Sequence, residues 1–117
     1  MKCIVTGGAG FIGSHLVDAL LAYGYKVSVL DNFSTGRREN LEHVADKVDI
    51  VECDLGDTES WAEEFSDIDW VFHLAALADI VPSIQQPDAY FRANVDGTFN
   101  ILRASQTAEI NRFVYVA

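Results

Sequence analysis

Five short, largely apolar runs punctuate the chain, at residues 3–5, 26–31, 48–53, 69–74 and 112–117. β-Branched and aromatic residues are frequent in them, and each run has the length of a β-strand. The run at 69–74 is almost continuously apolar, which is typical of a parallel strand that is covered on both faces. The hydrophobic pattern therefore predicts five strands.

Two longer segments between these runs have helical periodicity. Residues 11–22 predict an amphipathic helix that stops at Gly24, and residues 88–108 predict a long helix. Gly97 lies inside the long helix, where glycine costs ~1 kcal/mol relative to alanine, so we expect a close backbone approach there. The stripe expected on the first helix is Ile12, Leu16, Ala19, Leu20 and Tyr23. The two neighbouring stripes expected on the long helix are Phe91, Val95, Phe99 and Leu102, and Asn94, Thr98, Ile101 and Ser105.

The remaining connections are shorter. Residues 37–45 predict a short helix with a charged face, and residues 79–87, which contain two prolines, predict a loop or a broken helix. Another helix is expected after the third strand. Its start is marked either by Asp57 or Thr58 as the N-cap, or by a capping box of Ser60 and Glu63.

Strands and helices alternate along the whole chain, which predicts an α/β fold with a parallel sheet and helices on both of its faces. Right-handed crossovers give a doubly wound sheet with the strand order 3-2-1-4-5. With 117 residues, the chain is expected to form one domain, residues 1–117. In such a sheet a ligand binds at the carboxyl ends of the strands, where the order reverses between strands 1 and 4.

A glycine cluster follows the first strand directly. Gly8, Gly10 and Gly13 satisfy Gly-x-Gly-x-x-Gly, and Gly7, Gly10 and Gly13 satisfy Gly-x-x-Gly-x-x-Gly. Between a strand and a helix, such glycines make a tight turn, admit a pyrophosphate to bare backbone and bring the helix close to the strand. The amides of Phe11 and Ile12 would then face the phosphates from the helix N-terminus.

The second strand ends in Asp31, eighteen residues after Gly13. This is close to the spacing of about 20 residues at which an acidic residue binds the adenosine ribose of a dinucleotide. Arg37 and Arg38 offer a site for the 2′-phosphate of NADP, but a carboxylate facing that phosphate is repulsive. The sequence therefore favours NAD as the cofactor.

Other candidate residues follow the strand ends. Asp54 is either a turn residue or an acceptor for the adenine amino group, with Leu55 covering the ring. Ala75 and Ala76 allow backbone to lie close to a cofactor, and His73 is interpreted as structural rather than catalytic.

Composition narrows the class of partner and compartment. Half of the residues are hydrophobic and the net charge is −10, which argues against nucleic acid or an anionic membrane as a partner. Cys3 and Cys53 have no metal-ligand spacing and are interpreted as reduced core thiols of a cytoplasmic protein. No secretory signal or membrane-spanning run is evident, and no metal site is expected.

These residues together resemble the extended short-chain dehydrogenase/reductases that act on nucleotide sugars, an NAD-dependent epimerase/dehydratase family with a Rossmann-type fold. The resemblance is carried by the segments 6–17, 29–36, 73–76, 82–84 and 94–98, with Pro87 and Tyr90. It implies that the pyrophosphate lies on Phe11 and Ile12, and the adenosine on Asp31, Asn32, Ser34, Thr35, Gly36, Asp54 and Leu55. It also implies that the nicotinamide end lies along Leu74, Ala75, Ala76 and Asn94. Some epimerases of the family carry a lysine at the position of Ala78.

The catalytic residues of that family have no counterpart in this sequence. The family uses a serine or threonine after the fifth strand and a Tyr-x-x-x-Lys pair, whereas no tyrosine of this chain has a lysine four residues later. We therefore expect a domain truncated after strand 5, without catalytic residues, nucleotide-sugar domain or turnover of its own. Its last strand would leave an unprotected sheet edge, so we expect self-association or a homo-oligomer.

Two functions remain open from the sequence. The first is the NAD-binding portion of a nucleotide-sugar epimerase or dehydratase that oxidises a sugar C4 hydroxyl. The alternative is a non-catalytic dinucleotide-binding module, such as a redox sensor or an assembly partner.

Overall fold

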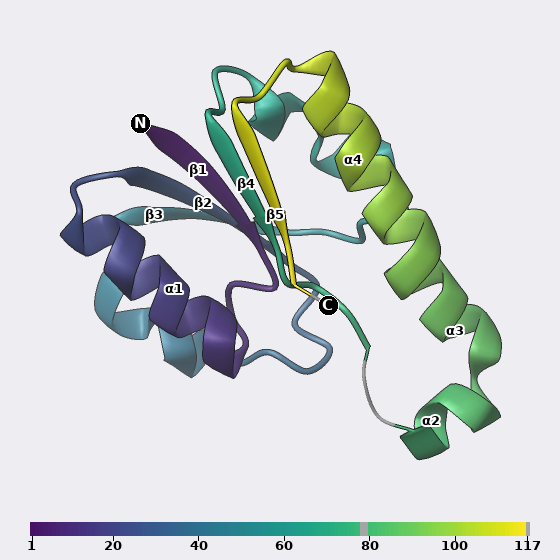
Figure 1. The fold of residues 1–117 in the computed structure, drawn as a ribbon. Helices are drawn as coiled ribbons and strands as arrows, with labels where there is room; N and C mark the ends of the chain where they lie inside the picture. Colours follow the sequence, from purple (N-terminus) through teal and green to yellow (C-terminus); the bar gives the residue numbers. More distant parts are fainter. Residues whose placement is uncertain (78–79, 117) are drawn as a thin grey trace.

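A single parallel sheet organises the chain in the computed structural model (Figure 1). Its strands are β1 (Lys2–Thr6), β2 (Lys26–Asp31), β3 (Val48–Glu52), β4 (Trp70–His73) and β5 (Arg112–Tyr115). They lie in the order β3-β2-β1-β4-β5, and all four neighbouring pairs are parallel. The strand order and the α/β class predicted from the sequence are confirmed.

The structure describes residues 1–77 and 80–116. Ala78, the first residue of the loop expected at 79–87 and the last residue of the expected fifth strand lie outside this range. Within the described residues, no helix combines the length and the apolar character needed to cross a membrane.

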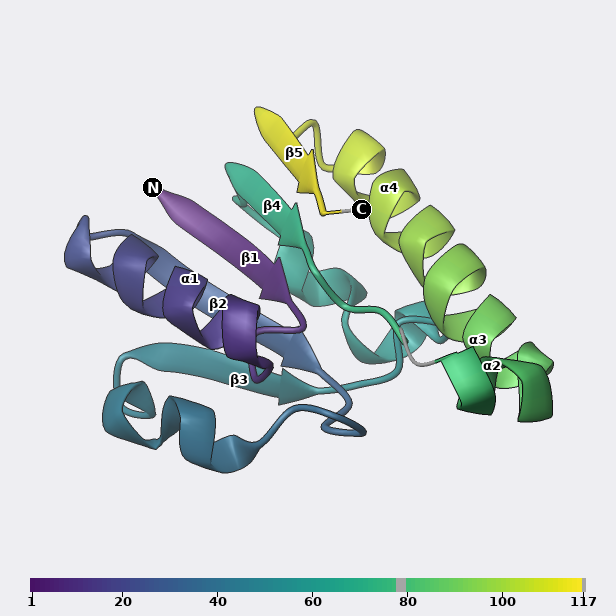
Figure 2. The same ribbon diagram turned by 60° about the horizontal axis from the view of Figure 1, so that its bottom comes forward.

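Two hydrophobic layers cover the two faces of the sheet. Figure 2 shows from a second direction how helices lie on either side of the strands. In β1, Cys3 and Val5 point into the layer beneath helix α1 (Phe11–Ala22), whereas Ile4 points into the layer that contains Ile101 of helix α4 (Gly97–Thr107). This alternation follows from the two-residue period of a strand. Helices therefore lie on both faces, as predicted.

Helix α1 has the predicted bounds, but its buried face differs from the expected stripe. The buried residues are Gly13, Ser14, Val17 and Leu20. Ile12 and Tyr23 are instead 64% and 76% exposed. The close contact of Gly13 with the preceding turn fixes the rotation of the helix, and this contact outweighs the count of apolar side chains.

The connections on either side of β3 are tighter than expected. The predicted helix at 37–45 is the 3₁₀ segment η1 (Arg38–Val44), and the one after Asp57 is two short 3₁₀ segments, η2 (Thr58–Ser60) and η3 (Ala62–Phe65). Asp57 is the N-cap, because its carboxylate accepts the Glu59 N–H at 3.2 Å. The capping box of Ser60 and Glu63 is wrong, since the Ser60 hydroxyl donates to the carbonyl oxygen of Asp57.

The expected broken helix contains α2 (Ile80–Gln85), and the expected long helix is an almost straight rod in Figure 1. The rod consists of α3 (Pro87–Phe91), the π-helical segment η4 (Arg92–Asp96) and α4. The stripe of the rod that faces the sheet is the one expected at Asn94, Thr98, Ile101 and Ser105. Gly97 gives the predicted close approach, because a Cβ there would lie 3.2 Å from Cβ of Leu55. The apolar stripe of Phe91, Val95, Phe99 and Leu102 is exposed.

Candidate functional site

A cleft opens at the carboxyl ends of β1 to β4, where the sequence placed the ligand site. Its lining includes most of the predicted site residues, namely Gly7, Gly10, Asp31, Asn32, Ser34, Thr35, Gly36, Asp54, Leu55, Leu74, Ala75 and Ala76. Phe11, Ile12, Gly13 and Asn94 do not line it, although they lie in elements that do.

The glycine turn between β1 and α1 brings backbone atoms unusually close together. Gly7 has φ +73°, and a Cβ there would lie 2.8 Å from the backbone nitrogen of Ala75. A Cβ at Gly13 would lie 2.2 Å from the carbonyl oxygen of Gly7, whereas one at Gly10 would be 3.4 Å from it. Gly8 instead packs over Val29, so the spacing of Gly7, Gly10 and Gly13 describes the turn.

Gly10 is the N-cap of α1, and no side chain caps this end of the helix. The first N–H groups of an α-helix have no partner within the helix, which leaves the amides of Phe11 and Ile12 to bind an anion. The side chain of Phe11 is 77% exposed, so its predicted role rests on the backbone alone.

Asp31 is the buried acid of the cleft, only 8% exposed. Its Oδ2 accepts the Ala9 N–H at 3.0 Å, and its Oδ1 accepts the Phe33 N–H at 2.8 Å. The carboxylate thereby ties the glycine turn to the loop after β2. Each oxygen retains capacity for a second donor, such as a ribose hydroxyl.

The loop at 32–36 curls back towards the glycine turn. Phe33 adopts φ +58°, the Asn32 side chain accepts the Ser34 N–H at 3.0 Å, and a Cβ on Gly36 would lie 2.8 Å from Cβ of Ala9. Arg38, a candidate for binding a 2′-phosphate, stacks 4.1 Å above the Phe33 ring and forms an ion pair with Glu52.

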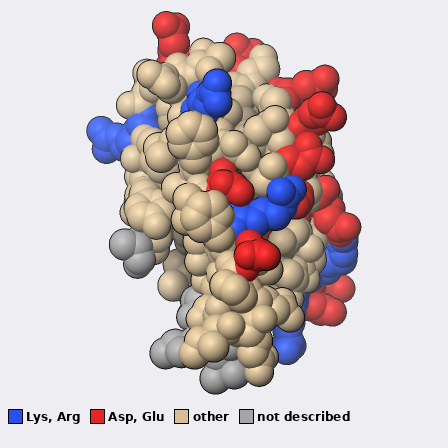
Figure 3. Space-filling view, turned by 90° about the vertical axis from the view of Figure 1, so that its right-hand side faces the viewer, with Lys and Arg blue, Asp and Glu red and all other residues tan. Residues whose placement is uncertain are grey.

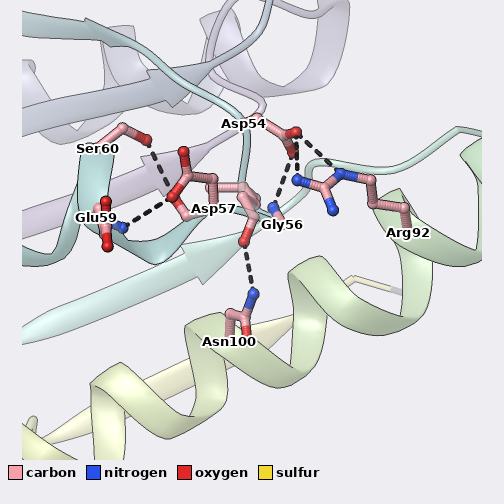
Figure 4. Close-up of polar contacts among 8 residues, drawn as sticks. Asp54, Gly56, Asp57, Glu59, Ser60, Arg92 and Asn100 are labelled. Atoms are coloured by element: carbon pink, nitrogen blue, oxygen red, sulfur yellow. Dashed lines mark hydrogen bonds and ion pairs between the residues drawn. The ribbon is translucent and has the colours of Figure 1, made fainter.

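Asp54 follows β3 and lies between its own turn and the long helix (Figure 4). Its Oδ1 accepts the Gly56 N–H at 2.8 Å, and its Oδ2 accepts a hydrogen bond from Nε of Arg92 at 3.0 Å. Nη2 of Arg92 lies 2.9 Å from the same oxygen and completes the ion pair. The Gly56 hydrogen bond and the Arg92 guanidinium hold the pKa of Asp54 below its usual value. Asn100 of α4 donates to the carbonyl oxygen of Leu55 at 2.9 Å, which fixes this loop.

The segment after β4 is held by two side chains. Thr6 Oγ1 accepts the N–H groups of Leu74 and Ala75, both at 3.1 Å. Asn94 forms two hydrogen bonds to Leu77, because its Oδ1 accepts the Leu77 N–H and its Nδ2 donates to the Leu77 carbonyl, each at 2.8 Å. Asn94 thus shapes the wall of the cleft through Leu77.

His73 is buried between the sheet and α4, at 1% exposure. Since Thr6 Oγ1 already accepts two N–H groups, its hydroxyl hydrogen points to Nδ1 of His73, 2.7 Å away. Nε2 then carries the ring proton and donates to Thr98 Oγ1 at 2.8 Å. Burial lowers the pKa of His73 to about 4, so the ring is neutral at pH 7.

Four residues of the lining were not predicted as site residues: Leu30, Cys53, Leu77 and Ala93. Each of them is next to a predicted residue in the sequence. Leu30, Cys53 and Leu77 could have been predicted from their positions near the ends of strands, whereas Ala93 lies in the long helix. Cys53 is a free thiol whose pKa is raised to about 11, chiefly by burial. Among residues 1–77 and 80–116, no group of three metal-binding side chains occurs.

The arrangement suits a dinucleotide. Bare backbone and free helix amides meet at one end of β1, a buried carboxylate lies beside them, and apolar residues continue on either side. Gly7 and Gly10 line this cleft with bare backbone, which is the form of a pyrophosphate cradle.

Comparison with known proteins places this geometry in context. Residues 3–117 match the family described as the NAD dependent epimerase/dehydratase family. The UDP-N-acetyl-alpha-D-glucosaminuronate decarboxylase of Bacillus cytotoxicus is 38% identical over 104 residues, which are 89% of this chain and 32% of that protein. This chain spans about a third of the length of curated relatives that it matches.

Solved structures agree with the sequence matches. The UDP-glucose 4-epimerase of Thermotoga maritima, solved with UDP-glucose, has a TM-score of 0.91 and 38% identity, over 98% of this chain and 37% of that one. The UDP-glucose 4-epimerase of Thermus thermophilus, solved with NAD, has a TM-score of 0.87 and 41% identity, over 97% and 36% of the two chains.

Proposed function

The chain belongs to the NAD-dependent epimerase/dehydratase family, and we propose that it binds NAD in the cleft at the carboxyl ends of β1 to β4. The observation that carries this proposal is the buried carboxylate of Asp31, fixed by two backbone amides beside a turn in which Gly7 and Gly13 have no room for a Cβ. The solved Thermus relative in complex with NAD supports the choice of ligand.

Different residues of the cleft bind different parts of NAD in this proposal. Gly7 and Gly10 admit the pyrophosphate to the amides of Phe11 and Ile12, with Gly13 holding the helix close. Asp31 accepts hydrogen bonds from the adenosine ribose. The remaining adenosine contacts are Asn32, Ser34, Thr35, Gly36, Asp54 and Leu55. The nicotinamide end lies along Leu74, Ala75 and Ala76, on the wall that Asn94 holds through Leu77.

NAD is preferred over NADP for an electrostatic reason. A 2′-phosphate would face the buried Asp31 carboxylate, and like charges in a buried site repel strongly. Arg38 does not offset this repulsion, because its guanidinium is paired with Glu52 and stacked on Phe33.

The whole protein acts on a nucleotide sugar in this proposal, as the names of the epimerase and decarboxylase relatives suggest. Bound NAD would supply a hydride acceptor for oxidation of a sugar C4 hydroxyl. These 117 residues contribute the cofactor site without turnover of their own, because no tyrosine is followed by lysine at the fourth position. The alternative, a non-catalytic dinucleotide-binding module, shares the same site and rests on that absence alone.

Two free, buried cysteines suit a reducing compartment. Cys3 and Cys53 belong to different hydrophobic layers, on opposite faces of the sheet. Two cysteines separated in this way do not form a disulfide with each other, so oxidising conditions would not stabilise this fold. We therefore assign the protein to the cytoplasm.

The first test is calorimetric titration with NAD and, separately, with NADP. We expect NAD to bind more tightly than NADP, and Asp31→Asn to weaken NAD binding by about 10- to 100-fold, the effect of losing a charge-assisted hydrogen bond. Asp49→Asn is the matched control, because Asp49 is exposed on β3 and does not line the cleft. Thermal melting of each variant verifies folding. Absence of NAD binding by the folded wild-type chain would refute the proposal.

Self-association is the second property that we expect. β5 is an edge strand on which Tyr115 is 58% exposed, with Val116 beyond it at 47%. Figure 3 shows the side that carries α4, where uncharged surface covers much of the face and acidic groups gather along one margin. An open strand edge flanked by apolar side chains favours pairing with a second copy.

Sedimentation velocity tests this expectation. Wild-type protein should shift to larger species as its concentration rises, and the double variant Tyr115→Lys, Val116→Lys should remain monomeric, since charges on an edge oppose strand pairing. Tyr23→Lys is the control, because Tyr23 is also exposed, at 76%, but is the C-cap of α1. A strictly monomeric wild type at high concentration would contradict the expectation.

A further inference from the structure

Arg92 contacts the predicted adenine acceptor directly. Its Nε donates a hydrogen bond to Oδ2 of Asp54 at 3.0 Å, and its Nη2 forms an ion pair with the same oxygen at 2.9 Å (Figure 4). Both side chains are about half exposed, at 51% and 52%, so this ion pair lies at the mouth of the cleft rather than in the core. Neither the glycine motif nor the spacing of the strands pointed to Arg92.

The local helix geometry presents Arg92 to the cleft. The segment η4 is π-helical, and the N–H of Gly97 donates to the carbonyl oxygen of Arg92, five residues earlier. Three successive residues of η4 then meet the strand-end loops: Arg92 binds Asp54, Ala93 lines the cleft, and Asn94 holds Leu77. π turns within helices occur frequently at functional sites.

The contacts leave Asp54 with a defined remaining capacity. A carboxylate oxygen accepts about two hydrogen bonds. Oδ2 accepts one hydrogen bond, from Nε of Arg92, and is in ion-pair contact with Nη2, whereas Oδ1 accepts one from the Gly56 N–H. One acceptor position therefore remains on Oδ1, the oxygen that Arg92 does not contact. The Gly56 hydrogen bond and the guanidinium lower the pKa of Asp54, so the carboxylate acts as an acceptor at neutral pH.

A purine base meets this acceptor with one of two groups at its sixth position. Adenine presents an amino group, which donates to Oδ1. Hypoxanthine presents a carbonyl oxygen, which faces a carboxylate oxygen and leaves the acceptor without a donor. A site that hydrogen-bonds one group disfavours the analogue that lacks it, and because Asp54 is about half exposed, the expected discrimination is moderate.

We propose that Arg92 is a positioning residue, which orients Asp54 as a fixed acceptor and thereby makes the cleft select a 6-aminopurine dinucleotide over its 6-oxo analogue. This inference rests on the proposed binding of NAD. Gly56 is part of the same device, because a Cβ there would lie 2.7 Å from Cζ of Arg92 and would displace the guanidinium.

The test compares the binding of NAD and of nicotinamide hypoxanthine dinucleotide by calorimetric titration. We expect the wild-type chain to prefer NAD by about tenfold or more, the effect of one charge-assisted hydrogen bond. Arg92→Met should weaken NAD binding while leaving the hypoxanthine analogue nearly unchanged, so that the preference falls severalfold. Gly56→Ala, which keeps the arginine but moves it, should lower the preference in the same direction.

Matched variants separate positioning from a general effect of charge. Arg103→Met removes a positive charge from the same rod, where the side chain lies 5.8 Å from the Phe99 ring and outside the cleft, and should retain the wild-type preference. Arg92→Lys restores one donor and the charge, and should recover part of the preference. If Arg92→Met had the same ratio of affinities for NAD and the hypoxanthine analogue as the wild type, this inference would be overturned and the proposed function would stand. If the folded wild type bound neither dinucleotide, both the inference and the proposed function would be overturned.

Discussion

Gly13→Ala should unfold or severely destabilise the chain, lowering the free energy of unfolding by about 3 kcal/mol or more. The added Cβ would lie 2.2 Å from the carbonyl oxygen of Gly7 and 2.9 Å from two further backbone atoms. All three of these nearest atoms are backbone, so the clash cannot be relieved by turning a side chain aside. Relief requires α1 to shift away from the sheet, which would uncover Val17 and Leu20. Urea denaturation followed by circular dichroism measures the loss.

Gly10→Ala is the control for this prediction, in the same turn. Its Cβ would lie 3.4 Å from the Gly7 carbonyl oxygen, and its φ of −78° suits alanine. We expect near wild-type stability, together with weaker NAD binding, because Gly10 lines the cleft. Gly13→Ala is thus expected to affect stability, whereas Gly10→Ala is expected to affect ligand binding. Equal stability of the two variants would contradict the steric argument.

Acidification should destabilise the protein through His73. Its pKa is lowered to about 4 in the folded chain, against an ordinary value of 6.5, because burial disfavours the charged ring. The unfolded state therefore binds more protons than the folded state between these two pKa values. The free energy of unfolding is accordingly unaffected by His73 above pH 6.5 and falls as the pH drops towards 4. The shift corresponds to about 3 kcal/mol. Denaturation at a series of pH values measures it.

His73→Asn isolates the contribution of the imidazole. The variant should be less stable at pH 7, because it disturbs the hydrogen bonds from Thr6 to Thr98, but its stability should fall less steeply between pH 6.5 and 4. Asp54 contributes separately at lower pH, since its lowered pKa makes its stabilisation disappear only as the carboxylate protonates. Equal pH slopes for wild type and variant would contradict a buried, neutral histidine.

The hydrogen bonds around His73 also link the cleft wall at Leu74 and Ala75 to the core of the fold. Thr6 holds His73 and the backbone of Leu74 and Ala75 with one hydroxyl group, and Thr98 joins the same network from α4. Loss of the neutral ring would therefore loosen both the sheet and the expected nicotinamide end. His73, which the sequence predicted to be structural, therefore also supports the cleft, through its hydrogen bond with Thr6.

Local sequence determined the strands, their order and the glycine turn. Each strand is one apolar run, each crossover has one handedness, and Gly7, Gly10, Gly13 and Asp31 are related by short spacings. These features depend on backbone geometry within a few residues or within a single βαβ unit. For the same reason the ends of α1 and β2 were predicted to the residue.

Tertiary packing decided which helix faces are buried and which side chains meet. The stripe expected on α1 is buried only in part, at Leu20 and Leu16, whereas Ile12 and Tyr23 are exposed, because contact between Gly13 and Gly7 sets the rotation of the helix. The pairing of Arg92 with Asp54 joins residues 38 positions apart, and that of Thr6 with His73 joins residues 67 apart. Periodicity describes one element at a time, whereas these partners meet only after the sheet and the rod have docked, so the sequence names the residues of the site and the fold assigns their contacts.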